Sequence, residues 1–148
     1  MKIEIEKLEP GQLEKMLPFA SVGSLTTEAL ERAYFSEGSV ACCLLADGEP
    51  VFAGGIVNLQ WGRGEAWIVP TPFFKRHLKT CFSIIKKFLP KMAVTWGFRR
   101  VQAVCFGGVS GNLFSHLGFK YEGKLSCFGP SGEDCSMYAR IFSGEVSG

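Results

Sequence analysis

Hydrophobic and polar residues alternate over residues 3–8 (IEIEKL), and this period of two predicts a half-buried β-strand. Pro10 can occupy the first turn of a helix, which we expect over residues 10–17. Thr26 or Thr27 can cap a second helix, which we expect to run to about residue 35. The chain is therefore predicted to begin with one strand and two helices.

The hydrophobic pattern changes from helical to extended at residue 39. Asp47-Gly48 separates two apolar runs and is a strong hairpin signal. Gly54 and Gly55 in the second run indicate a bulge or a close approach of two backbones. Trp61 begins a glycine-rich turn (WGRG) that leads into a third run. The pattern predicts an antiparallel meander with strands over residues 39–46, 51–60 and 65–69.

A long amphipathic helix is predicted next. Thr71 is a candidate N-cap, and Pro72 fits the first helical position. Hydrophobic residues then recur at spacings of three and four with basic residues between them, which indicates one buried stripe and one basic face. We expect Pro90 to kink or end this helix and Gly97 to cap its last turn. The predicted buried stripe comprises Phe74, Leu78, Cys81, Phe82, Ile85, Phe88, Leu89 and Met92.

The remaining sequence predicts a buried strand over residues 101–106 and a short helix that begins at Ser110 and ends at Gly118. Residues 120–128 and 135–142 then form a closing hairpin. The full order is β-α-α-β-β-β-α-β-α-β-β. It predicts an α/β (α+β) fold with a mixed, mostly antiparallel sheet of about seven strands, four helices and one parallel crossover.

A length of 148 residues, with 47% hydrophobic and 20% charged residues, fits one globular domain. We expect this domain over residues 1–142 and a flexible tail over residues 143–148. The alternating first residues resemble neither a signal peptide nor a transit peptide, and no apolar run is long enough to cross a bilayer. These features predict a cytoplasmic protein without a membrane partner.

The six cysteines are interpreted as small buried hydrophobic residues in a reducing compartment. Cys42 and Cys43 are adjacent, so on a strand they point to opposite faces, and the sequence has no C-x-x-C pair. Cys81 lies on the predicted buried stripe. A catalytic or metal-binding cysteine is the alternative, and no metal site is predicted.

Charge is distributed unevenly although the net charge is only +2. No Asp or Glu occurs between Glu65 and Glu122, so this interval should carry a positive field that favours a phosphate-rich ligand. A solvated helix face would explain the same residues equally well. The basic residues of the interval are Lys75, Arg76, Lys79, Lys86, Lys87, Lys91, Arg99, Arg100 and Lys120.

This order of elements and three segments resemble the GNAT superfamily of acetyl-CoA-dependent N-acetyltransferases. Residues 97–104 (GFRRVQAV) are similar to the helix-to-strand junction of its ribosomal-protein N-terminal acetyltransferase branch. Residues 110–123 (SGNLFSHLGFKYEG) are similar to the last helix of that branch, which ends in Gly-Phe-x-x-Glu-Gly. The third segment is the closing hairpin, where Asp134 precedes a strand. The chain also resembles small GNAT-like proteins encoded by bacteriophages, including proteins packaged in podovirus particles.

The sequence departs from the superfamily in the loop that binds the phosphates of CoA. The pattern Arg/Gln-x-x-Gly-x-Gly/Ala should follow the strand that ends at Val69, but residues 70–78 (PTPFFKRHL) contain no glycine. In the superfamily these glycines let backbone N–H groups approach the pyrophosphate. The resemblance therefore implies that Lys75, Arg76 or Lys79 supply positive charge instead.

Two further departures concern the catalytic centre. Phe114 stands where many members have a tyrosine that protonates the departing thiolate, and Gly107 replaces an asparagine that often follows the fifth strand. Tyr121 and Tyr138 are alternative proton donors, although packing in the core or the hairpin explains them as well.

The resemblance implies a cofactor site for acetyl-CoA or CoA. Backbone groups of Trp67, Ile68 and Val69 on one strand, and those of Val104 to Phe106 on another, would flank the pantetheine arm. The further cofactor contacts implied are Phe74, Lys75, Arg76, Lys79, Ser110, Asn112 and Phe114.

Two residues are candidates for catalysis. Glu65 would be the general base, acting directly or through water, because the superfamily commonly has a glutamate on this strand. The alternative is a surface carboxylate at the end of a hairpin. Ser110 would be the acid or a cofactor contact, and the alternative for it is a plain helix cap.

The function expected from this resemblance is transfer of an acetyl group to an amine, whether a protein N-terminus, a lysine or a small molecule. The alternative is a non-catalytic GNAT-like module that serves in binding or structure, as in a phage particle. Nucleic-acid binding is disfavoured, because the Phe residues fall on the buried stripe and do not alternate with basic residues on the surface. A homodimer is compatible with the sequence, and a bacterial or phage-infected cytoplasm is the expected location.

Overall fold

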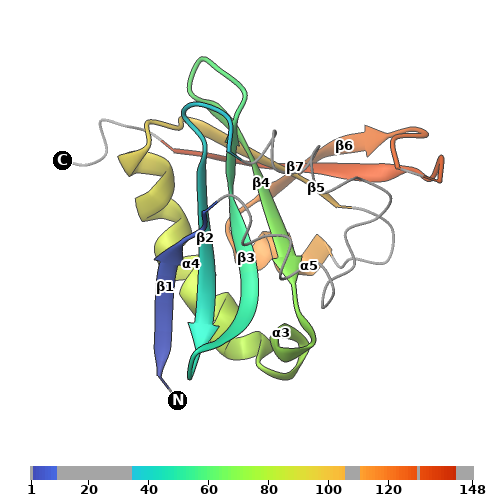
Figure 1. The fold of residues 1–148 in the computed structure, drawn as a ribbon. Helices are drawn as coiled ribbons and strands as arrows, with labels where there is room; N and C mark the ends of the chain where they lie inside the picture. The colour runs from blue at the N-terminus through green and yellow to red at the C-terminus, as the bar shows by residue number, and fades with distance from the viewer. Residues whose placement is uncertain (1, 10–34, 106–110, 130, 143–148) are drawn as a thin grey trace. The chain divides into compact units, whose positions relative to one another are not determined.

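The computed structural model describes residues 2–9, 35–105, 111–129 and 131–142 (Figure 1). Seven strands form one sheet in the order β1-β2-β3-β4-β5-β7-β6. The strands are β1 (Ile3–Lys7), β2 (Val40–Ala46), β3 (Glu49–Asn58), β4 (Arg63–Pro70), β5 (Arg100–Cys105), β6 (Lys120–Leu125) and β7 (Cys135–Ile141). The helices of the described part are α3 (Pro72–Arg76), α4 (Leu78–Thr95) and α5 (Gly111–His116). The helices predicted over residues 10–17 and 26–35 lie outside the described residues, apart from Phe35.

The predicted mixed sheet is confirmed. β4 and β5 pair in parallel, with Arg63 opposite Arg100 and Glu65 opposite Gln102. The pairs β1–β2, β2–β3, β5–β7 and β6–β7 are antiparallel. The long connection between β4 and β5 contains α3 and α4, as a crossover between parallel strands requires.

The chain divides into two compact units. Unit 1 comprises residues 1–58 and 66–81, and unit 2 comprises residues 59–65 and 82–148. The single domain expected over residues 1–142 stays a prediction.

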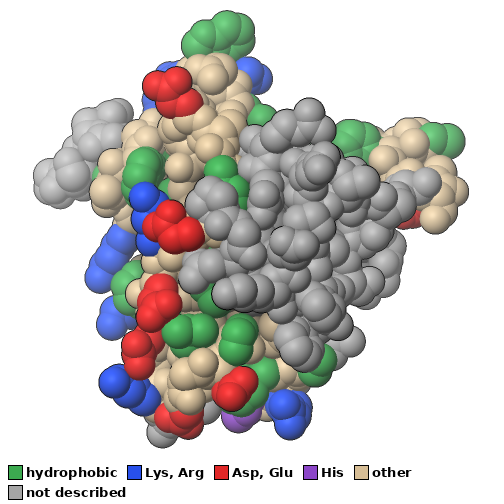
Figure 2. All heavy atoms as spheres, in the orientation of Figure 1, with side chains coloured by type: hydrophobic (Ala, Val, Ile, Leu, Met, Phe, Trp, Pro, Cys, Tyr) green, Lys and Arg blue, Asp and Glu red, His purple; other side chains and the backbone are tan. Residues whose placement is uncertain are grey.

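Unit 1 is built on the antiparallel strands β1, β2 and β3. The predicted hairpin at Asp47-Gly48 is confirmed, and both residues have positive φ (50° and 81°), as this type of turn requires. The close backbone approach predicted at the two glycines is also confirmed, because a Cβ on Gly55 would collide with the carbonyl oxygen of Val40. Charged side chains of both signs reach the surface near β1 (Figure 2), where Lys2 pairs with Glu4 at 3.3 Å. Such charges protect an exposed sheet edge from further pairing.

The single helix predicted from Thr71 onward is broken in the structure. α3 ends at Arg76, His77 has non-helical angles (φ −128°, ψ 39°), and α4 begins at Leu78. Thr71 does precede the helix with Pro72 at its first position, but its hydroxyl does not cap the helix. Thr71 Oγ1 instead donates to the carbonyl oxygen of Val51 at 2.6 Å, which ties the start of α3 to β3.

α4 also differs from its prediction. It continues through Pro90 to Thr95, so that Pro90 does not end it. The predicted cap is confirmed: Gly97 has a φ of 81°, and the N–H of Phe98 donates to the carbonyl oxygen of Ala93 at 2.8 Å. The predicted buried stripe is only partly buried, because Leu78 and Phe88 are 43% and 39% exposed.

Unit 2 contains β5, β7 and β6 with α5. Val101, Ala103 and Cys105 are buried on β5, while Arg100, Gln102 and Val104 between them are half-buried. This alternation places Arg100 and Gln102 on the same face of the sheet. The closing hairpin is confirmed as β6 and β7, with a register shift between Tyr121 and Gly123.

All six cysteines lie in the described part of the chain and are free thiols. The predicted burial holds for Cys43, Cys81, Cys105 and Cys135, whereas Cys42 is half-buried and Cys127 is exposed, so that the prediction was wrong for Cys127. Burial raises the pKa of the Cys43 thiol to about 11 and also raises the pKa of Cys42, Cys81, Cys105 and Cys135. A catalytic thiol requires the opposite shift, so these five do not support the alternative of a catalytic cysteine. No helix within the described ranges is long and apolar enough to cross a membrane.

Candidate active site

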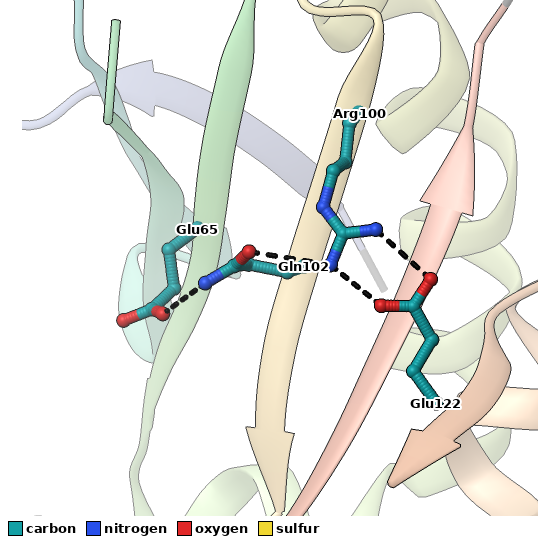
Figure 3. Close-up of polar contacts among 4 residues, drawn as sticks. All are labelled: Glu65, Arg100, Gln102 and Glu122. Atoms are coloured by element: carbon teal, nitrogen blue, oxygen red, sulfur yellow. Dashed lines mark hydrogen bonds and ion pairs between the residues drawn. The ribbon is translucent and has the colours of Figure 1, made fainter.

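Glu65 lies on β4, in the part of that strand that pairs with β5. It is the third residue of this strand after the turn that follows β3, and it is half-buried. Gln102 is its register partner on β5, and Gln102 Nε2 donates a hydrogen bond to Glu65 Oε1 at 3.1 Å (Figure 3). The carboxylate of Glu65 is therefore held in place by a side chain of the neighbouring strand.

Arg100 and Glu122 continue this row of polar side chains (Figure 3). The guanidinium donates to both carboxylate oxygens of Glu122, at 2.6 and 2.9 Å. This two-point geometry raises the pKa of Arg100 and lowers the pKa of Glu122, in both cases first through the hydrogen bonds between them. β7 lies between the strands that carry the two residues, so their side chains bridge two strand spacings, or about 10 Å.

Arg100 also fixes the orientation of the Gln102 amide. Arg100 Nη2 lies 3.4 Å from Gln102 Oε1, and a guanidinium can only donate. The amide oxygen must therefore face Arg100, which turns the amide nitrogen toward Glu65. The four residues form one directed chain of contacts, in which Glu122 holds Arg100, Arg100 orients Gln102, and Gln102 binds Glu65.

Glu65 was predicted from the resemblance to the superfamily, whereas the other three residues were not. Gln102 interrupts an otherwise apolar strand (RVQAVC), and a polar residue at a half-buried strand position could have been recognised as a partner for Glu65. Arg100 lies within the acid-free interval and Glu122 at its C-terminal end, and only the fold brings the two side chains together. The likeness of residues 110–123 to the superfamily did not predict this contact.

The other catalytic candidate, Ser110, and the predicted cofactor contact Phe106 lie outside the described residues. Asn112 and Phe114 are on α5. The Phe114 ring stacks on Tyr138 with centroids 5.2 Å apart, and Tyr138 meets Tyr121 edge-on at 5.6 Å. These ring contacts support the interpretation that Tyr121 and Tyr138 serve in packing.

In unit 1, Trp67, Ile68 and Val69 lie on β4, as expected, and Ile68 is 42% exposed. Phe74 is buried and packs edge-on against Phe52 with centroids 5.5 Å apart. Its ring is thus part of the core, which leaves only its backbone for a cofactor.

The segment expected to bind phosphates is helical where the superfamily has a glycine-rich loop. Its backbone donors are used internally: the N–H of Phe74 donates to Thr71 O at 3.0 Å, and that of His77 donates to Phe74 O at 3.1 Å. The guanidinium carbon of Arg76 lies 5.4 Å from the centre of the Phe73 ring. The His77 ring stacks on the same Phe73 ring, with centroids 4.1 Å apart. Arg76 and Lys79 are exposed, while Lys75 is on α3. This segment can offer positively charged side chains, but it does not offer the set of free backbone N–H groups that a glycine-rich loop provides.

Comparisons with solved structures match the chain over nearly its full length. The ribosomal-protein-S18-alanine N-acetyltransferase from Escherichia coli has a TM-score of 0.78 at 14% identity, and the match covers 96% of this chain and 95% of that protein. The chain has the GNAT fold. A GNAT-family acetyltransferase from Streptococcus pneumoniae matches with a TM-score of 0.73 at 15% identity, over 96% of this chain and all of that protein.

Ard1 from Thermoplasma volcanium also has this fold, with a TM-score of 0.78 at 11% identity and coverage of 97% and 99%. No protein-family profile matches the sequence, and no curated protein matches it significantly. The resemblance recognised in the sequence is thus confirmed at the level of the GNAT fold, and a phage origin stays a prediction.

Proposed function

We propose that this GNAT-fold protein transfers an acetyl group from acetyl-CoA to an amine. The observation that carries the proposal is the Glu65 carboxylate, held on β4 by Gln102 at 3.1 Å in a chain with this fold. The likeness to three acetyltransferases of 11–15% identity supports the fold, and the activity rests on the side chains.

In the proposed reaction, acetyl-CoA is a substrate that supplies an activated acetyl thioester. The amine nitrogen forms a bond to the carbonyl carbon, and the bond from that carbon to sulfur breaks. Glu65 accepts the proton that the amine loses, directly or through one water. Because Gln102 donates to one carboxylate oxygen, the other oxygen is oriented for this task. Much of the rate would come from holding the two substrates together, which needs no unusual side chain.

Arg100 and Glu122 are positioning residues in this scheme, because they act on Glu65 through Gln102. Loss of either would let the Gln102 amide rotate and weaken its hydrogen bond to Glu65. The departing thiolate would be protonated by Ser110 or by solvent, and Phe106, Asn112 and Phe114 stay proposed cofactor contacts.

The phosphates of CoA need positive charge and hydrogen-bond donors, and the residues of α3 and the start of α4 can be compared with both needs. The charge fits, because Arg76 and Lys79 are exposed cations near the start of α4. The backbone does not reproduce the glycine-rich loop, since α3 uses its own N–H groups. We therefore expect CoA to be held by side-chain cations and more weakly than a ring of backbone donors would hold it.

A non-catalytic GNAT-like module is the second candidate. The observation in its favour is the same short helix α3, which stands where the superfamily binds pyrophosphate. In that case the chain would serve as a binding or structural protein, and acetyl-CoA would not be its ligand.

Calorimetric titration with acetyl-CoA separates the two candidates. We expect binding to the wild type, at least a tenfold loss for the Arg76→Glu, Lys79→Glu double variant, and wild-type affinity for Glu65→Gln. The matched control is Lys86→Glu, Lys87→Glu, which makes the same charge change on α4 about 12 Å further along the helix. Absence of heat with the wild type would favour the non-catalytic module, and equal losses in both double variants would refute the assignment of Arg76 and Lys79.

A further inference from the structure

Trp61 is displayed to solvent in the turn between β3 and β4, and its side chain is 78% exposed. Gln60, Trp61 and Gly62 all have positive φ (74°, 59° and 74°). A positive φ costs roughly 1–2 kcal/mol at each residue that is not glycine. The backbone therefore opposes folding at Gln60 and Trp61, and an indole that stays in water contributes little to stability. Strained residues of this kind often have a functional reason.

Arg99 holds this strained turn against the segment that joins α4 to β5. Its Nη2 donates to the carbonyl oxygen of Trp61 at 2.7 Å, and its backbone N–H donates to the carbonyl oxygen of Gly62 at 2.6 Å. Both partners belong to unit 2, and Arg99 directly precedes β5, four residues after α4 ends at Thr95. The turn is thus fixed in place, and the indole is displayed from a rigid support.

Exposed aromatic rings and basic side chains pair at two places in unit 2, in the turn at Trp61 and on α4. The guanidinium carbon of Arg63 lies 5.0 Å from the centre of the Trp61 ring, and Lys91 Nζ lies 5.7 Å from that of Phe88. Trp96, next to the cap of α4, is 51% exposed. We call these residues the aromatic–basic surface: Trp61, Arg63, Phe88, Lys91, Trp96 and Arg99.

Nucleic-acid binding is disfavoured from the sequence because the Phe residues fall on the buried stripe, and the structure shows that this reason does not hold for Phe88. The sequence pattern places Phe88 on the buried stripe of the helix, but Phe88 is 39% exposed, and Lys91 lies over its ring. Trp96, which follows the basic helix, and Trp61, in the turn between β3 and β4, are more exposed than Phe88. Basic residues do pair with exposed aromatic residues here.

The charge of unit 2 points to an anionic partner. Unit 2 contains nine of the sixteen Lys and Arg residues and five of the fourteen Asp and Glu residues, a net charge of +4, while unit 1 has a net charge of −2. Among the acidic residues of unit 2, Glu122 is paired with Arg100 and Asp134 with Lys124. An anion that approaches the aromatic–basic surface therefore meets a positive field.

We propose that the aromatic–basic surface binds single-stranded nucleic acid, with bases stacked on its rings and phosphates neutralised by Arg63, Lys91 and Arg99. Stacking on an aromatic side chain contributes about 1–3 kcal/mol per base and tolerates any sequence. A duplex keeps its bases stacked on one another and offers no face to Trp61, so single strands are preferred. This binding is separate from the proposed acetyl transfer and uses different residues.

Fluorescence anisotropy of an end-labelled oligo(dT) of about 20 nucleotides, measured at several KCl concentrations, tests the proposal with the full-length protein. Three neutralised phosphates predict a slope of about −2 in log affinity against log salt. Trp61→Gly should weaken binding at least fivefold, the effect of about 1 kcal/mol, while Trp61→Phe should lose less. Glycine is chosen because it accepts the positive φ of this position, so that the turn stays folded.

A charge-matched pair of variants separates surface binding from general attraction. Arg63→Gln with Lys91→Gln should reduce the salt slope by about 1.4, whereas Lys2→Gln with Lys7→Gln, on exposed residues of unit 1, should leave it unchanged. The proposal is overturned if oligo(dT) does not bind, if Trp61→Gly binds like the wild type, or if both double variants lose equally. It is also overturned if a duplex, or poly-glutamate at equal charge, competes as well as the single strand, since the partner would then be a duplex or an acidic protein.

Discussion

The ion pair between Arg100 and Glu122 should make the stability of the protein depend on pH in a predictable way. Glu122 has a lowered pKa in the folded state, because Arg100 donates two hydrogen bonds to its carboxylate. A lowered folded-state pKa means that the stabilisation is fully present above the unfolded-state pKa and is lost as the pH falls through the folded-state value. The Glu122→Gln variant removes the titrating charge and nearly preserves the shape of the side chain.

The expected magnitude follows from the exposure of the pair. The side chains of Arg100 and Glu122 are 27% and 42% exposed, so water screens the attraction, while the two-point geometry places the pair at the upper end of surface ion pairs. We expect Glu122→Gln to lower the free energy of unfolding by about 1 kcal/mol near pH 7 and by almost nothing near pH 2. Arg100 keeps its charge in both measurements, which isolates the titration of Glu122.

Urea unfolding followed by circular dichroism measures this difference at each pH. A double-mutant cycle with Arg100→Met should return a coupling of about 1 kcal/mol near pH 7 that disappears in acid. A Glu122→Gln effect that is equal at both pH values, or a coupling near zero at pH 7, would refute the reasoning. Lys124→Gln is a control for general charge effects, since Lys124 pairs with Asp134 instead.

Three further predictions concern local features of the fold. Gly62→Ala should lower the free energy of unfolding by about 2 kcal/mol, because the new Cβ would lie 2.8 Å from Arg99 Nε and the residue has a positive φ. Gly48→Ala, whose Cβ would meet open space, should lower it by about 1 kcal/mol. Thermal unfolding of both variants checks this order. Thr71→Val should lose about 1 kcal/mol in urea unfolding, and Thr71→Ser should lose much less, since serine keeps the hydroxyl that donates to Val51. Iodoacetamide at about pH 8 should label the exposed Cys127 in the folded protein and spare Cys43, whose pKa burial raises to about 11; peptide mass spectrometry reads this out, and rapid labelling of Cys43 would contradict its burial.

The strands could be predicted from the sequence because their signals are local. Alternation over residues 3–8, the Asp47-Gly48 turn and the glycines at the helix ends each depend on a few neighbouring residues. Gly97 is an example, since a positive φ after an apolar helix nearly requires glycine. These elements agree with the GNAT order, and the parallel pair of β4 and β5 then follows from the length of their connection.

The break of the helix at His77 could not be predicted, because it depends on a tertiary contact. The sequence around it has a helical period on both sides, and Thr71 has the composition of an ordinary cap. In the fold, the Thr71 hydroxyl is taken by Val51 of β3, so the first turn is anchored to the sheet and the helix restarts after it. The exposure of Phe88 likewise depends on the neighbours of α4 and not on its spacing.

The candidate site was predicted only at its centre. Glu65 was recognised through resemblance, whereas Gln102, Arg100 and Glu122 come together through the register of three different strands. Glu122 lies at the register shift of β6, and a bulge of this kind turns a side chain in a way that alternation does not foresee. The sequence alone therefore named the proposed base but not the side chains that orient it.

Acetyl transfer itself is the most direct test of the proposed function. The wild type, Glu65→Gln and Glu122→Gln are each incubated with acetyl-CoA and a panel of amines comprising peptide N-termini, lysine peptides and polyamines, and released CoA is separated chromatographically. Glu65→Gln should lower kcat by about 10²–10⁴, as loss of a general base does, and Glu122→Gln should lower it by a smaller factor. CoA release by the wild type that Glu65→Gln leaves unchanged would contradict the role of Glu65, and the absence of release with every amine would contradict acetyl transfer.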